Sequence, residues 1–231
     1  MDLTFSLRRK KIVEAEPLVS EVRERWPALF TEEQICAEFY RITTVDLMRT
    51  FHGSLEKHSA QLIRLYRARR GAFGDDMQSL LDKLDEQIKL LWSSTSDNLA
   101  HRKMTVLKGL PLFLREKPGN LLKMCLDTDP EESYTKGVKV GIITVVEDDV
   151  ASSNSLPTVT SVAIVLEEAV VFEDVRDLST AFALLFDLLY VLNTDFSKEL
   201  KYTFEVIQQV LMDLGSQCSA RVQSLKTKLL L

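Results

Sequence analysis

The sequence predicts an α+β fold that is predominantly helical, with an N-terminal helical array followed by a small antiparallel sheet packed with two C-terminal helices. Apolar residues recur at intervals of three and four through most of the first 91 residues, which indicates amphipathic helices. β-branched residues cluster between Val138 and Phe172, and an almost wholly apolar stretch, Leu178–Leu192, precedes an amphipathic one. Hydrophobic residues at 45% and charged residues at 27% are typical of globular proteins.

Residues 1–15 are expected to form a flexible basic tail, marked by the cluster Arg8-Arg9-Lys10-Lys11. No apolar run precedes this cluster, so the segment lacks the pattern of a secretory signal. We therefore expect an intracellular protein, cytoplasmic or nuclear.

Residues 16–130 are expected to form the helical region. Pro17 suits the first turn of a helix that ends near residue 25. Thr31, followed by Glu32 and Glu33, predicts the N-cap and first turn of a second helix, which reaches about residue 42. The sequence therefore predicts two short helices before a longer array.

Longer helices follow from Thr44 to the glycine at position 71, and from Asp75 or Asp76 to about residue 91. Residues 93–97 either form a loop or cap a further helix, which we expect to end near Gly109 and Pro111. The short apolar segment 121–126 is expected to be one more helix.

Residues 131–216 are expected to form a strand–strand–helix–helix region, either separate from the helical region or continuous with it. Val138–Val146, Thr158–Val165 and Ala169–Phe172 predict strands, the last two joined at Glu167-Glu168. Residues 148–157, rich in serine, predict an exposed loop.

The apolar stretch Leu178–Leu192 is too short for a membrane span and contains Asp187, so it predicts a buried helix. Such a helix must be covered by the sheet, by the last helix or by another subunit. Asp177 or Ser179 is expected to cap it. An amphipathic helix then ends at Gly215, and residues 217–231 are expected to be a loosely ordered tail.

The charge of the chain is unevenly distributed along the sequence. The net charge is −5, but residues 1–117 hold 20 Lys and Arg against 17 Asp and Glu, whereas residues 118–231 hold 9 against 17. Two ordinary solvated surfaces, or surfaces that orient toward a partner, would both give this pattern.

No motif for catalysis or cofactor binding is present in the sequence. Glycine-rich phosphate loops and the GxSxG motif are absent, and His52, His58 and His101 include no pair four residues apart for a shared metal. Three widely spaced cysteines, Cys36, Cys125 and Cys218, predict reduced thiols. We therefore expect no enzyme activity, no catalytic or metal-ligating residues and no cofactor.

The strongest candidate for a binding surface is a basic patch near the end of the helix that stops at position 71. The helix dipole favours positive charge there, which by itself accounts for several arginines. The functional alternative is that the patch binds a phosphate backbone or an acidic partner. The patch comprises Arg64, Arg67, Arg69, Arg70, Arg102 and Lys103.

Three ordered motifs resemble a large group of fish proteins, often labelled sterile alpha motif domain-containing protein 3-like, in the region outside the sterile alpha motif. The motifs are Arg25-Trp-Pro-Ala-Leu-Phe30, Gly109-Leu-Pro-Leu-Phe-Leu-Arg-Glu116, and Ala181–Phe186 through Leu200–Gln208. The resemblance covers nearly the whole chain from about Ser6 and implies no activity or site residues. The sterile alpha motif itself, a self-association module, is not found in these residues.

These observations favour a non-enzymatic interaction or scaffold module that binds a protein partner or self-associates, with no membrane contact. The alternative is a nucleic-acid-binding protein of mobile-element ancestry that uses the basic helix. An enzyme would require a pocket that gathers a histidine, a cysteine and a carboxylate.

Overall fold

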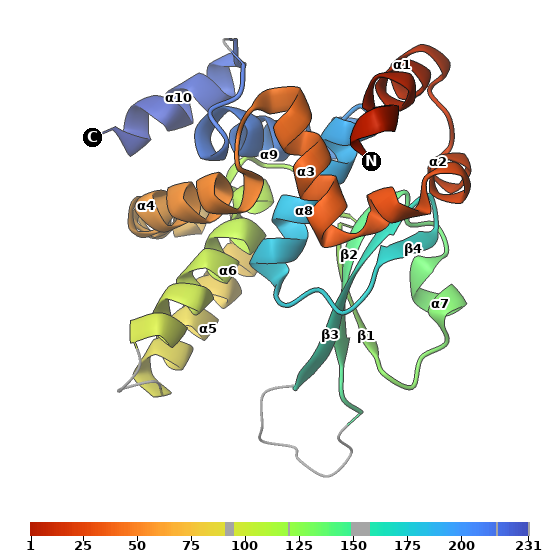
Figure 1. Cartoon of the computed structure of the whole chain (residues 1–231). Helices are drawn as coiled ribbons and strands as arrows, with labels where there is room; N and C mark the ends of the chain where they lie inside the picture. The colour runs from red at the N-terminus through yellow and green to blue at the C-terminus, as the bar shows by residue number, and fades with distance from the viewer. Residues whose placement is uncertain (91–94, 120, 149–157, 216, 231) are drawn as a thin grey trace. The chain divides into compact units, whose positions relative to one another are not determined.

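The computed structural model describes residues 1–90, 95–119, 121–148, 158–215 and 217–230 (Figure 1). These residues form helices and one small four-stranded sheet, so the predominantly helical α+β class is confirmed. The chain divides into two compact units of two segments each: unit 1 is Met1–Leu47 with Gly119–Asp195, and unit 2 is Met48–Pro118 with Phe196–Leu231. The expected limit between residues 130 and 131 does not coincide with a boundary of either unit.

The sheet of unit 1 is mixed, not purely antiparallel as expected. Its strands lie in the order β1 (Leu122–Leu126), β2 (Val140–Val146), β3 (Val159–Leu166) and β4 (Ala169–Phe172). The pairs β2–β3 and β3–β4 are antiparallel as predicted, and β1 adds to β2 in parallel. The expected loop at 148–157 falls almost wholly outside the described residues.

Strand β1 corrects the prediction of a short helix at residues 121–126. Its residues favour a helix locally, but the edge of β2 offers a ladder of backbone hydrogen bonds, with Cys125 opposite Val145. The Cys125 side chain is buried in one cluster with Ile143 and Val165. A short helix, α7 (Glu131–Thr135), connects β1 to β2.

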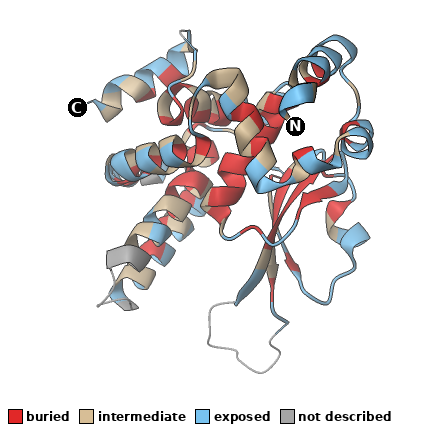
Figure 2. Cartoon of the chain, viewed as in Figure 1, coloured by how far each residue is buried: buried red, intermediate tan, exposed pale blue. Residues whose placement is uncertain are grey.

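Helix α8 (Leu178–Val191) is the buried helix that the sequence predicts, and the Asp177 carboxylate caps it by accepting the Thr180 N–H at 2.9 Å. It packs against β2, β3 and α3 (Glu32–Thr43). The Phe39 ring of α3 lies edge-on to Phe186 and Tyr190 of α8. The sheet and α3 therefore cover this helix, and Figure 2 shows buried residues concentrated along it.

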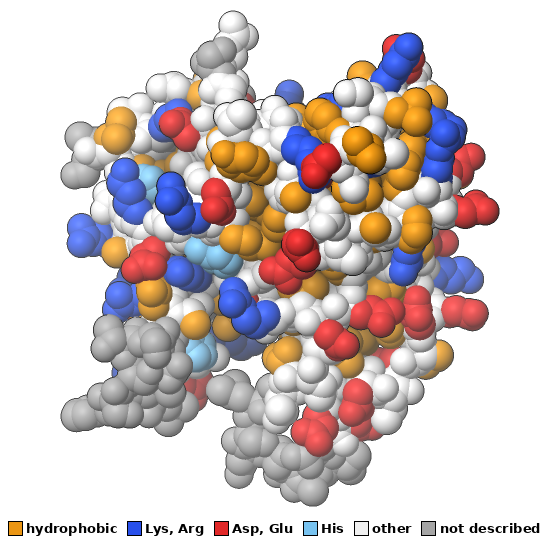
Figure 3. Space-filling model, viewed as in Figure 1, with side chains coloured by type: hydrophobic (Ala, Val, Ile, Leu, Met, Phe, Trp, Pro, Cys, Tyr) orange, Lys and Arg blue, Asp and Glu red, His pale blue; other side chains and the backbone are white. Residues whose placement is uncertain are grey.

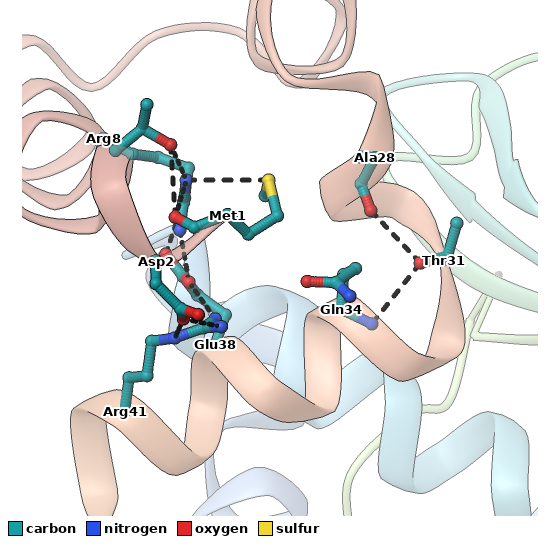
Figure 4. A network of polar contacts seen from close by, with 9 residues as sticks. Met1, Asp2, Arg8, Ala28, Thr31, Gln34, Glu38 and Arg41 are labelled. Carbon is teal, nitrogen blue, oxygen red and sulfur yellow. Dashed lines mark hydrogen bonds and ion pairs between the residues drawn. The ribbon is translucent and has the colours of Figure 1, made fainter.

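The N-terminal residues are helical rather than a flexible tail. A 3-10 turn, η1 (Asp2–Thr4), leads into α1 (Phe5–Ala15), in which Arg8 and Ile12 are buried. Arg8 reaches Glu38 of α3, and Arg41 joins Glu38 to Asp2 (Figure 4). Half of the basic cluster is exposed, but its first arginine anchors α1 to α3.

Two further short elements, α2 (Val19–Arg25) and η2 (Pro27–Phe30), connect α1 to α3. The Thr31 hydroxyl accepts the Gln34 N–H at 3.4 Å, which confirms the predicted N-cap of α3. Thr44 was expected to cap the following helix, but its φ of 60° instead ends α3.

Unit 2 is wholly helical within its described residues. Helix α6 (Thr95–Phe113) ends two residues beyond the expected end near Pro111, whereas α10 (Ala220–Leu229) corrects the prediction of a loosely ordered tail. Val222 and Leu225 of α10 are buried, which explains why this segment is ordered. The elements are α4 (Leu47–Ala68), η3 (Arg70–Ala72), α5 (Gly74–Leu90), α6 (Thr95–Phe113), η4 (Lys198–Leu200), α9 (Lys201–Val206), the π-helical turn η5 (Ile207–Leu211) and α10 (Ala220–Leu229).

Candidate anion-binding groove

The fold separates charge more sharply than the sequence halves suggest. The residues of unit 1 include 11 Lys and Arg against 23 Asp and Glu, a net charge of −12. Those of unit 2 include 18 Lys and Arg against 11 Asp and Glu, a net charge of +7. In Figure 3, Lys and Arg side chains gather over α4 of unit 2, and Asp and Glu side chains gather near α7 of unit 1. Unit 2 is thus a basic body within an acidic chain.

An open groove of about 1030 Å³ crosses this basic unit. It is bordered by the end of α4 with η3, by the end of α6 and by α10. Its described lining contains five cationic side chains and neither aspartate nor glutamate. The cations are Arg67, Arg69, Arg115, Arg221 and Lys228.

Each cation reaches the groove from the end or the face of a helix. Arg67 and Arg69 lie where α4 passes into η3. Arg115 follows α6 and has a left-handed φ of 55°, which turns the chain sharply at this helix end. Arg221 and Lys228 are seven residues apart on α10, a spacing that places both on one face of the helix.

Helix α10 is held in place by contacts that also fix one wall of the groove. The Arg221 guanidinium donates to the Leu114 carbonyl at 2.7 Å and lies 4.3 Å from the centre of the Tyr202 ring. At the other end of the helix, Gln61 donates to the Lys228 carbonyl at 3.3 Å. Arg221 therefore both lines the groove and attaches α10 to α6.

Aromatic rings line the groove together with the cations. Phe73 and Phe113, both half-buried, have ring centres 5.2 Å apart, and Phe113 lies 5.2 Å from the buried Tyr66 ring. The Tyr66 hydroxyl donates to the Val106 carbonyl at 3.0 Å. Tyr66 thus packs against Phe113, and both Phe73 and Phe113 remain partly exposed.

The five cations differ in their existing partners. Arg67 pairs with Asp85, and Arg221 is engaged as described above. Arg69, Arg115 and Lys228 have no ion-pair or side-chain hydrogen-bond partner among the residues that the structure describes. Three charged groups in one groove without an internal counter-ion favour binding of an external anion.

The structure divides the basic patch that the sequence predicts. Arg67 and Arg69 line the groove, and Arg64, Arg67 and Arg102 line a separate cavity of about 280 Å³. Lys103 lies 3.5 Å from Glu56, and the Arg70 side chain is outside the described part of the structure. Sequence reasoning missed Arg115, Arg221 and Lys228, because no linear pattern joins them to the end of α4.

The Cys36 thiol lies in unit 1, next to the buried Asp187 of α8. Burial is the main cause that raises the pKa of Cys36 to about 12. Burial raises the pKa of Asp187 well above its ordinary value. Within the described ranges, no cluster of three or more His, Cys, Asp or Glu is placed to hold a metal.

Comparisons with known proteins match only the beginning of the chain. A family model described as the helical domain of sterile alpha motif domain-containing protein 3 matches residues 1–31, which contain α1, α2 and η2. No curated protein and no solved structure matches the chain. Among the described helices, none is both long and apolar enough to cross a membrane.

Proposed function

We propose that this chain is a non-enzymatic interaction module in which unit 2 binds a polyanionic partner. The observation that carries this proposal is the groove whose described lining has five cations and no carboxylate, on a unit of net charge +7. Clustered positive charge in a concave surface raises the local concentration of anions and speeds their association. Four of the five cations are arginines, which suit the recognition of planar or tetrahedral oxyanions.

The chemistry of the groove supports binding rather than catalysis. Its described lining residues include no histidine, cysteine or carboxylate, the side chains that most often act as general bases or as their partners. The raised pKa of Cys36 keeps that thiol protonated near neutral pH, and a protonated thiol is a poor nucleophile.

We also propose that the chain belongs to the sterile alpha motif domain-containing protein 3-like family. The match of residues 1–31 to the helical-domain model supports this. The motifs at Arg25–Phe30, Gly109–Glu116 and Ala181–Gln208 support it independently. No activity follows from this membership.

Retention on immobilised heparin tests the proposal that the groove binds polyanions. The purified full chain should be retained despite its net charge of −5 and should elute as salt rises. The variant Arg69→Glu with Arg115→Glu should elute much earlier. Lys198→Glu with Lys201→Glu is the matched control, because it changes the charge of unit 2 equally at exposed residues outside the groove lining.

Two results would contradict the proposal. A wild-type chain that passes through heparin at low salt would show that the groove does not attract polyanions. Equal shifts of the groove variant and the control would show that net charge, not the groove, determines retention.

A further inference from the structure

We infer that the polyanion for which the groove is built is a single-stranded nucleic acid, with phosphates on Arg69, Arg115 and Lys228 and unpaired bases against Phe73 and Phe113. This inference rests on the proposed function and specifies its ligand. It follows from two features of the lining taken together, the cations without internal partners and the partly exposed aromatic rings.

The number of cations and the size of the groove suit a chain of repeated charges better than one isolated anion. Arg69, Arg115 and Lys228 come from three segments that are distant in the sequence, and they border a groove of about 1030 Å³. A single small anion would need several donors to converge on one point, whereas a backbone that runs along the groove meets charges one after another. Positive grooves that follow the backbone are typical of proteins that bind single strands.

The aromatic rings distinguish nucleic acid from an acidic peptide. Bases stack on phenylalanine rings, and this contact is a large part of the affinity of single-strand binding proteins. Phe73 and Phe113 lie in the same lining as the arginines, with Tyr66 packed against Phe113. The carboxylates of an acidic peptide would pair with the cations, but the peptide has no flat group in each repeat that could stack on the rings.

The concave shape of the site favours a single strand over a duplex. A duplex presents its base edges only to an element that enters a groove of the nucleic acid, such as a protruding helix. Here the rings lie in a depression of the protein, where bases that are already unpaired can reach them. The rings would contribute little to the binding of a duplex.

The experiment measures fluorescence anisotropy of labelled oligouridine and oligothymidine, the corresponding duplex and a poly-glutamate peptide of equal charge, each with the full chain. Single strands should bind most tightly. With three phosphates neutralised, their affinity should fall about 20-fold between about 50 and 200 mM salt. Comparison of the two oligonucleotides shows whether an RNA strand and a DNA strand bind differently.

Substitutions test the two features separately. Arg69→Glu with Arg115→Glu should weaken single-strand binding by about tenfold or more, whereas Lys198→Glu with Lys201→Glu should have a much smaller effect. Phe73→Leu keeps an apolar contact with Phe113 but removes the ring, and should cost about fivefold or more for oligonucleotides with no change for heparin. Thermal unfolding of each variant establishes that it is folded.

The outcomes separate this inference from the proposed function. Tight binding of poly-glutamate without binding of oligonucleotides would overturn the inference and leave a groove for acidic peptides. Preference for the duplex, or oligonucleotide binding that is unaffected by both the arginine variant and Phe73→Leu, would also overturn it. If neither heparin, poly-glutamate nor any oligonucleotide bound, the proposed function itself would fail.

Discussion

Arg8 of α1 donates two hydrogen bonds to the Glu38 carboxylate of α3, at 2.7 and 2.5 Å, and both side chains are almost fully buried. The Thr4 hydroxyl accepts a further bond from Arg8 at 2.9 Å, and Arg41 donates to Glu38 at 2.9 Å. This network fixes a helix in a segment whose local sequence predicts a tail. It also places the part of the chain that matches the helical-domain model against α3.

Truncation of Arg8 tests this anchor. Arg8→Ala should lower the free energy of unfolding by about 3–5 kcal/mol, because it leaves the Glu38 charge buried with only Arg41 as a partner. Lys10→Ala, an exposed change on the same helix, should alter it by less than about 0.5 kcal/mol. Urea unfolding measures both values. Equal stabilities would mean that α1 does not hold to α3.

Two helical glycines should respond oppositely to alanine. A Cβ on Gly109 of α6 would lie 2.6 Å from the Tyr66 ring, which is buried and held by its bond to Val106. Overpacking of this kind costs about 1–3 kcal/mol, more than the gain of about 1 kcal/mol in helix propensity. Gly53 of α4 has no atom within 4 Å of such a Cβ, so Gly53→Ala should stabilise by about 0.5–1 kcal/mol.

Thermal unfolding measures the melting temperatures of Gly109→Ala and Gly53→Ala, which should change in opposite directions. Tyr66→Leu combined with Gly109→Ala should show less than the sum of the two single costs, because the smaller side chain removes the clash. If Gly109→Ala raised the melting temperature as Gly53→Ala does, the close approach of α4 and α6 would be wrong.

Asp187 should make stability depend on pH. Burial raises its pKa in the folded state well above the ordinary value of 3.8, so the folded protein keeps a proton that the unfolded chain releases. Its contribution is complete below about pH 4 and is lost as pH rises toward the folded pKa, by up to about 1.4 kcal/mol per pH unit. Asp187→Asn should remove this dependence.

The measurement is urea unfolding of the wild type and Asp187→Asn from about pH 4 upward. The stability of the wild type relative to the variant should decline with rising pH. Parallel curves would show that Asp187 is not protonated in the fold, and a rising difference would reverse the sign of its pKa shift.

Glu116 should hold the start of α9. Its carboxylate accepts the N–H groups of Tyr202 and Thr203 at 2.6 and 2.9 Å and the Thr203 hydroxyl at 2.6 Å. Glu116→Ala should cost about 1–3 kcal/mol, because these donors at a helix start lose their acceptor. Hydrogen exchange at these two amides should quicken. The exposed Lys117→Ala should leave the stability and the exchange rates of these amides unchanged. Equal exchange rates in the two variants would contradict the role of Glu116 at the start of α9.

Sequence periodicity predicts the elements that are long or strongly patterned. The stripes in α3, α4 and α5, the cap at Thr31, the three later strands and the buried helix after Asp177 all follow from spacing and composition. It fails where a long-range partner overrides the local preference. Residues 122–126 pair with β2, and Arg8 forms an ion pair with Glu38. Val222 and Leu225 are buried.

Part of the candidate site can be predicted from the sequence, and the rest depends on the tertiary structure. The arginines at the end of α4 are visible in the sequence, because they lie within seven residues of one another at the end of a predicted helix. Arg115, Arg221 and Lys228 become part of the groove only when the ends of α6 and α10 meet the end of α4. The sequence also contains Phe73 and Phe113, but they form one surface only because Phe113 packs against both Tyr66 and Phe73.

By itself, the sequence determined the α+β class, most helices and the absence of catalytic motifs, because these depend on residue types and on spacings of a few positions. The tertiary structure decided the parallel strand β1, the anchored terminal helices and the sorting of charge into units of −12 and +7. Each of these depends on segments that are distant in the chain. Burial and electrostatic interactions act between residues that are close in space, and the local sequence does not predict which distant residues those are.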